Sequence, residues 1–111
     1  MSATEIVQRQ LDAYNAQDID AFCACFAADC VLAELNGAVT QKGADAIRQR
    51  YETLFSSYPE NHAALVNRVV VGNVVIDHED ITRSPSERIN AAAIYTVKDG
   101  LIARVDFVRA P

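Results

Sequence analysis

Apolar and polar residues alternate along residues 67–82, on either side of a Gly72-Asn73 dipeptide. Glycine in a two-residue turn supplies the positive φ that such turns need, so this segment predicts a hairpin of two antiparallel strands. The turn sets the register of the cross-strand pairs: Val71 with Val74, Val69 with Ile76, Arg68 with Asp77, Asn67 with His78, Val66 with Glu79 and Leu65 with Asp80.

This register divides the hairpin side chains between two faces, because neighbouring residues of a strand point in opposite directions. One face carries an ion cluster: Arg68, Asp77 and Glu79. The other face is an apolar strip that ends in polar groups: Leu65, Val69, Ile76, Asn67, His78 and Asp80. A few polar groups on an apolar wall are typical of a ligand cavity. We therefore expect the second face to line a cavity and the ion cluster to point away from it.

Three segments carry apolar residues every three or four positions, which predicts helices. The first covers residues 3–16. The second follows Asp18, a residue suited to capping a helix, and extends to about Ala27. The third begins near Gly43 and ends before Pro59, because proline cannot continue a helix.

Short apolar runs bounded by turn residues predict four more strands: 30–35, 39–41, 89–97 and 101–108. The dipeptide Asp99-Gly100 joins the last two and is the strongest hairpin signal in the chain. Its predicted pairing places Ala93 opposite Asp106 and Tyr95 opposite Arg104, on the face that also carries Ala91, Val97 and Ile102. The opposite face is apolar apart from Thr96: Ala92, Ile94, Val105 and Phe107. One layer of helices cannot cover both faces, so we expect a homodimer interface around Ile94, Val105 and Phe107.

Composition narrows the function classes. A chain of 111 residues, 50% of them hydrophobic, has the size of one domain, and we expect residues 1–111 to form it. The net charge is −5 and no Lys/Arg run is present, so we expect no nucleic-acid partner. No segment has the length of a membrane span and no secretion signal is recognisable, so we expect a cytoplasmic protein without a membrane partner. The spacing of Cys23, Cys25 and Cys30 matches neither zinc nor redox motifs, and we expect no metal and no cofactor.

The order of the predicted elements, ααββαββββ, resembles the cone-shaped fold of the nuclear transport factor 2-like superfamily, which includes the SnoaL-like proteins and the ketosteroid isomerases. The resemblance covers nearly the whole chain. It rests on these segments: IVQRQLDAYNAQDIDAF, DCVLAEL, GADAIRQRYETLF, NRVVVGNVVIDHE and IYTVKDGLIARVDFV. It implies an α+β, cystatin-like domain in which three helices pack on a curved antiparallel sheet around a small-molecule pocket.

Two branches of this superfamily imply catalytic residues. In the ketosteroid isomerases a carboxylate after the second helix is the general base, and Glu34 is at the similar position. The two oxyanion donors of those enzymes correspond to Gln10 and Ala93, so both donors are altered here. In the limonene-epoxide hydrolases an Arg-x-Asp pair and a late Asp activate water, and the similar positions hold His78-x-Asp80 and Asp106.

These observations give a set of candidate site residues. The catalytic candidates are Glu34, His78 and Asp106, and the pocket-lining candidates are Gln10, Tyr14, Tyr51, Phe55, Asn67, Asp80, Tyr95 and Arg104. Structural roles compete with these assignments, since Asp106 is spaced to pair with Arg104 and His78 to bond Asn67. We expect a small, largely uncharged ligand, because three carboxylates would face one arginine. The function is then either proton transfer or water addition on a mostly apolar metabolite, or ligand binding and dimeric interaction without catalysis.

Overall fold

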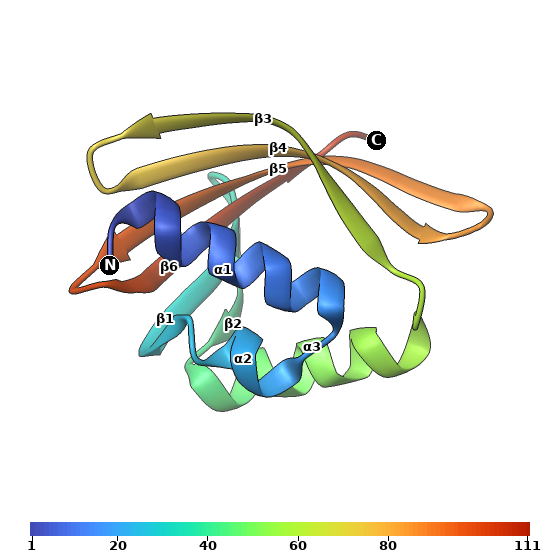
Figure 1. The fold of residues 1–111 in the computed structure, drawn as a ribbon, viewed down its shortest axis with the longest axis horizontal. Helices are drawn as coiled ribbons and strands as arrows, with labels where there is room; N and C mark the ends of the chain where they lie inside the picture. Colours follow the sequence, from blue (N-terminus) through green and yellow to red (C-terminus); the bar gives the residue numbers. More distant parts are fainter.

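The computed structural model describes residues 1–111 as three helices and six strands in the predicted order (Figure 1). The helices are α1 (Ala3–Ala16), α2 (Ile19–Cys23) and α3 (Ala44–Ser57). The strands are β1 (Phe26–Glu34), β2 (Val39–Lys42), β3 (His62–Val71), β4 (Val74–Ser84), β5 (Glu87–Lys98) and β6 (Leu101–Arg109). None of the helices is long and apolar enough to cross a membrane.

All six strands form one curved sheet in the order β2-β1-β6-β5-β4-β3, and the helices lie together on one side of it (Figure 1). The sheet is mixed rather than wholly antiparallel, because β1 and β6 pair in parallel. This arrangement confirms the α+β class and the predicted element order. It leaves one face of the sheet without a helix over it and encloses the other face.

Local sequence signals account for the helix ends. Ser2 caps α1 through a capping box with Glu5, and the Asp18 side chain accepts a hydrogen bond from the Ala21 backbone N–H at the start of α2. The third helix begins after Gly43 and ends at Ser57, before the proline. The second helix is shorter than predicted, because strand β1 already begins at Phe26. This residue pairs with Ile102 on the neighbouring strand β6.

The central hairpin has the predicted register next to its turn but not at its far end. All the predicted pairs from Val71–Val74 to Asn67–His78 form as expected. Beyond them the register shifts by one residue, so Leu65 rather than Val66 pairs with Glu79, and Ala64 pairs with Asp80. A β-bulge of this kind inserts one unpaired residue, which a pairing counted from the turn does not include.

The predicted assignment of the two faces of this hairpin is wrong. Val75 and Asp77 are fully buried and Glu79 is 7% exposed, so the face with the ion cluster is the inner one. Alternation determines which residues share a face, but it does not determine which face the helices cover. Burial of the charges is possible because Arg68 and Asp77 are paired directly across the strands.

A second bulge reverses the expected faces of β6. Val97 pairs with Ile102 and Thr96 with Arg104, which leaves Ala103 without a partner. As a result Tyr95 lies opposite Val105 and Ala93 opposite Phe107, instead of the predicted Arg104 and Asp106. Val105 is therefore a core residue with 1% exposure, and the predicted interface of Ile94, Val105 and Phe107 does not form one surface.

Candidate functional site

A cavity of about 250 Å³ lies between the helices and the inner face of the sheet. Helices α1 and α3 contribute part of its wall, and strands β1, β4, β5 and β6 contribute the rest. Most of the lining is apolar or aromatic, and its polar residues include Gln10, Tyr14, Arg50, Glu79, Arg83, Tyr95 and Arg109. An apolar enclosure with a few polar groups suits a small organic ligand.

Glu79 is the only carboxylate that lines this cavity. Its side chain is brought there by the inward alternation of β4, and neither of its oxygens has a hydrogen-bond partner within the protein. Burial raises the pKa of Glu79 to about 7, the charge of Asp77 adds to this, and Arg68 opposes it. A carboxyl group with this pKa can both accept and release a proton near neutral pH.

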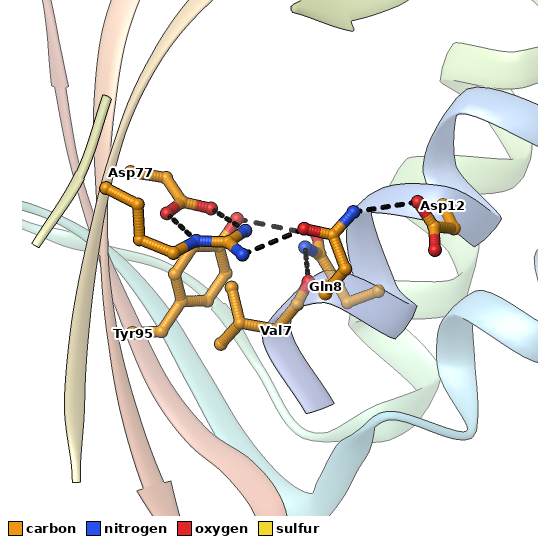
Figure 2. Close-up of polar contacts among 7 residues, drawn as sticks. Val7, Gln8, Asp12, Asp77 and Tyr95 are labelled. Atoms are coloured by element: carbon orange, nitrogen blue, oxygen red, sulfur yellow. Dashed lines mark hydrogen bonds and ion pairs between the residues drawn. The ribbon is translucent and has the colours of Figure 1, made fainter. Parts of the chain in front are cut away.

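Asp77 lies two residues before Glu79 on β4 and on the same face, but its environment is very different. Arg68 donates two hydrogen bonds to it, from Nε to Oδ1 at 2.6 Å and from Nη2 to Oδ2 at 2.9 Å. Arg68 also donates to Gln8 on α1, which in turn donates to Asp12. Figure 2 shows Asp77 on the sheet and Gln8 and Asp12 on the helix, on the two sides of this network. The network ties α1 to the sheet, and Asp77 itself is fully buried and does not line the cavity.

Two phenol groups supply hydrogen-bond donors inside the cavity. The Tyr14 oxygen accepts a hydrogen bond from Asn61 Nδ2 at 2.7 Å, so its own proton is free to donate to a ligand. The Tyr95 hydroxyl donates to Gln10 Oε1 over 3.5 Å, a long contact that a ligand oxygen could replace. Burial raises the pKa of both tyrosines, so both stay protonated at neutral pH.

Three arginines complete the polar lining, and their partners differ. Arg109 pairs with Glu34 at 2.6 Å, and Arg50 donates to the neutral side chain of Gln41 at 2.6 Å. Arg83 lies over the ring of Tyr58 and has no hydrogen-bond or ion-pair partner. The cavity therefore holds more positive than negative charge.

Four of the pocket residues proposed from the sequence line this cavity: Gln10, Tyr14, Tyr51 and Tyr95. Phe55 is buried and packs edge-on against Tyr14, behind the wall rather than on its surface. Figure 2 shows Tyr95 reaching from the sheet toward α1.

The expected common cavity of Asn67, His78, Asp80 and Asp106 does not form. The reversal of faces turns His78 outward, where its ring bonds Asn90 at 3.1 Å rather than Asn67. Asp80 pairs with Arg88 on the same outer face. The bulge in β6 also turns Arg104 and Asp106 outward, and these two residues pair with each other. None of these side chains lines the cavity.

Glu34 lies at the edge of the site but does not line it. Its side chain is 44% exposed, and its carboxylate accepts the hydrogen bond from Arg109, whose own side chain does reach the cavity. Glu34 therefore faces Arg109 and solvent rather than a ligand in the cavity.

Sequence reasoning missed Glu79 as a site residue because it grouped Glu79 with the outward ion cluster. One signal could have identified it. Arg68 and Asp77 are direct cross-strand partners and neutralise each other, which leaves Glu79 as the unpaired charge of the cluster. The structure also places no group of three or more His, Cys, Asp or Glu side chains where they could hold a metal ion.

Comparisons with known proteins agree on a family and a fold. The family model for the SnoaL-like domain matches residues 7–105. A cystatin-fold protein from Novosphingobium aromaticivorans is 30% identical with a TM-score of 0.93, over 98% of this chain and 99% of that one. A putative polyketide cyclase from Sinorhizobium meliloti is 26% identical with a TM-score of 0.81, over 97% of this chain and 100% of that one.

A more distant structure, a putative ketosteroid isomerase from Kribbella flavida, is 17% identical with a TM-score of 0.84, over 98% of this chain and 78% of that one. At this identity the likeness concerns the fold alone. The search of curated proteins found no match.

Proposed function

Because this chain belongs to the SnoaL-like domain family, we propose that it is an enzyme in which Glu79 transfers a proton within the cavity. The observation that carries this proposal is the state of the Glu79 carboxyl group. It is nearly buried, it faces an apolar cavity, and no protein group donates a hydrogen bond to it. Structural carboxylates in folded proteins are normally paired or hydrogen-bonded, whereas a general base must keep its oxygens free for the substrate.

The reaction class that fits these groups is proton transfer at a carbon next to a carbonyl. The Glu79 carboxylate takes the proton, and the C–H electron pair moves toward the carbonyl carbon while the carbonyl oxygen gains negative charge. The free O–H of Tyr14 donates a hydrogen bond to that oxygen. In a β,γ-unsaturated carbonyl compound this negative charge also extends to the γ-carbon. The Glu79 carboxylic acid returns the proton to that carbon while the C=C bond moves to the α,β position and the C=O bond re-forms, which completes an isomerisation without a cofactor.

Water addition has less support. The residues that suggested it, His78, Asp80 and Asp106, lie outside the cavity, and the cavity has one carboxylate instead of the pair expected. The similar structure from Sinorhizobium meliloti, named as a putative polyketide cyclase, supports a carbonyl compound as substrate.

Hydrogen exchange at carbon tests the proposal without knowledge of the natural substrate. Small apolar ketones and 1,3-dicarbonyl compounds are incubated with the protein in D₂O, and loss of the α-proton signal is followed by NMR. We expect the wild-type protein to accelerate exchange of at least one compound. General-base catalysis contributes about 10²- to 10⁴-fold in rate, so Glu79→Gln should lose about that factor.

Asp106→Asn is the matched control, because it also removes one carboxylate charge but on the outer face, where Asp106 pairs with Arg104. This variant should exchange at the wild-type rate. Equal rates from the wild-type and Glu79→Gln proteins, whether fast or slow, would return the chain to the class of ligand-binding proteins without catalysis.

A further inference from the structure

Arg83 is a cavity-lining arginine whose guanidinium has no partner. Its Nε is buried and makes no hydrogen bond, and no carboxylate lies within 4 Å of the group. Its one close neighbour is the ring of Tyr58, 5.6 Å from the guanidinium carbon to the ring centre. A buried donor without an acceptor has lost its hydrogen bond to water, and an acceptor supplied by a ligand would restore a hydrogen bond to it.

Arg83 is the arginine of this chain that has a buried nitrogen without a hydrogen bond. Of the five arginines outside the cavity, Arg9 has no carboxylate within 4 Å and four have one: Arg48, Arg68, Arg88 and Arg104. Of the three that line the cavity, Arg109 pairs with Glu34, whereas Arg50 and Arg83 have no carboxylate within 4 Å, although acidic residues outnumber basic ones by 15 to 10. The protein as a whole is acidic, but the cavity lining carries three arginines, one of them paired with Glu34, against the single carboxylate of Glu79.

This charge balance contradicts the basis of the expectation of a largely uncharged ligand. That expectation counted Glu34, Asp80 and Asp106 as cavity residues, and none of the three lines the cavity. Without them, an anionic group meets attraction rather than repulsion on entry.

The positions of Glu79 and Arg83 on one strand define how a ligand would lie. Glu79, Ile81 and Arg83 alternate onto the same face of β4, and all three line the cavity. Glu79 and Arg83 are four residue steps apart along the strand, which places their Cα atoms about 13 Å apart. Arg83 is next to the end of β4 at Ser84, whereas Glu79 is in the interior. A molecule anchored on Arg83 would therefore extend along Ile81 toward the carboxyl group of Glu79.

We propose that the ligand of this cavity is a small, mainly apolar carboxylic acid whose carboxylate is bound by Arg83. A carboxylate matches the side of a guanidinium, because its two oxygens can accept from Nε and one terminal nitrogen together. The cavity volume of about 250 Å³ limits the apolar part to a small body. The inference rests on the proposed function in one respect, namely that Glu79 acts on the molecule that Arg83 holds.

The test compares carboxylates with amides of the same shape. Cyclohexanecarboxylate and phenylacetate are titrated against cyclohexanecarboxamide and phenylacetamide, and dissociation constants are taken from NMR chemical-shift changes of the protein. We expect the wild-type protein to bind the carboxylates about 10-fold or more tightly than the amides, since hydrogen bonds to charged groups are worth about 1.5–3 kcal/mol. Arg83→Gln should lose this preference, and Arg83→Lys should keep part of it.

Arg88→Gln is the matched control. Arg88 lies on β5, the strand that follows β4 and pairs with it, but its side chain is exposed and pairs with Asp80 outside the cavity. This variant should keep the full preference, and circular dichroism should show that all variants remain folded. Equal binding of carboxylates and amides by the wild-type protein, no binding of either, or equal losses in Arg83→Gln and Arg88→Gln would each overturn the proposal.

Glu79→Gln separates this inference from the proposed function. Removal of a negative charge from the cavity should leave the carboxylate preference intact or increase it, while proton exchange is lost. If exchange is absent in every protein but the preference depends on Arg83, the proposed function fails and the binding site stands. If exchange depends on Glu79 but the preference does not depend on Arg83, only this inference fails.

Discussion

Asp77 and Glu79 are two inward carboxylates of one strand whose surroundings give them different chemistry. Asp77 has a bidentate partner in Arg68, which balances its charge and donates one hydrogen bond to each of its oxygens. Glu79 has the charge of Asp77 beside it and no donor, so its ionised form is disfavoured. Two residues of the same class thus divide into a structural ion pair and a candidate general base, and each gives a prediction.

The raised pKa of Glu79 predicts that the protein becomes less stable as pH rises. Folding takes the pKa of this group from its ordinary value of 4.5 to about 7, so the folded state binds the proton more tightly between these two pH values. Stability is then present in full below pH 4.5 and is lost as pH rises toward 7, by up to about 3 kcal/mol.

Urea unfolding of the wild-type and Glu79→Gln proteins at pH 5 and pH 8 measures this effect. The variant cannot ionise at this position, so its advantage over the wild-type protein should grow from pH 5 to pH 8. A difference between the two proteins that does not change with pH would contradict the assigned pKa.

The buried ion pair predicts a large cost for removal of one partner. Arg68→Met leaves the fully buried Asp77 carboxylate without its donors, and breaking a buried pair in this way typically costs about 3–5 kcal/mol. The double variant Arg68→Met/Asp77→Leu removes both charges and should recover most of that loss. Chemical denaturation of the three proteins measures both steps, and a double variant no more stable than Arg68→Met would show that the pair is not the cause.

At the scale of elements, turns and bulges together decide which side chains reach the cavity. Gly72 and Gly100 have positive φ, as does Asp99, so both hairpin turns form where the dipeptides indicate. The bulges at Val66 and Ala103 then change the pairing beyond those turns. The turn determines the register nearby, and the bulge determines the face farther along the strand.

Gly72 offers a direct test of the turn. Its φ is 58° and a Cβ at this position would meet nothing within 4 Å, so the effect of a substitution is purely conformational. Gly72→Ala should cost about 1–2 kcal/mol, the penalty for the left-handed region. Gly72→Asn should cost less, because asparagine tolerates this region. Thermal unfolding measures both, and equal stability of all three proteins would contradict the assigned turn.

At the scale of the whole molecule, the sheet has one face under the helices and one without them (Figure 1). The open face carries a cross-strand row of apolar residues, Val69, Ile76 and Ile94. Val69 is 46% exposed, and charged pairs such as Arg104–Asp106 lie on the same face beside this row. An apolar strip with a charged border is typical of a surface for association between proteins.

We therefore keep the prediction of a homodimer but place its interface on this open face, with the row of Val69, Ile76 and Ile94 at its centre. Light scattering at micromolar concentration should give twice the mass of the 111-residue chain. Ile94→Lys should shift the protein toward the monomer without affecting the cavity, since Ile94 points away from it. A monomer mass for the wild-type protein would refute the prediction.

The helices and strands of this fold follow from the amino-acid sequence, because their signals are local. Helical periodicity, the Asp18 cap and the dipeptides Gly72-Asn73 and Asp99-Gly100 act through neighbours in the chain. The same local information gave the pairing of Arg68 with Asp77 and several aromatic residues of the cavity wall.

The enclosed face of the sheet, and with it the identity of the site, depends on packing between distant parts of the chain. Alternation is symmetric between the two faces of a strand, and the symmetry is broken by contacts with helices that are distant in sequence. Bulges add a second long-range choice, which turned Asp106 outward and brought Val105 inward. Glu79 and Arg83 became site residues through these choices, because the burial and the missing partners that define their chemistry depend on the packed molecule.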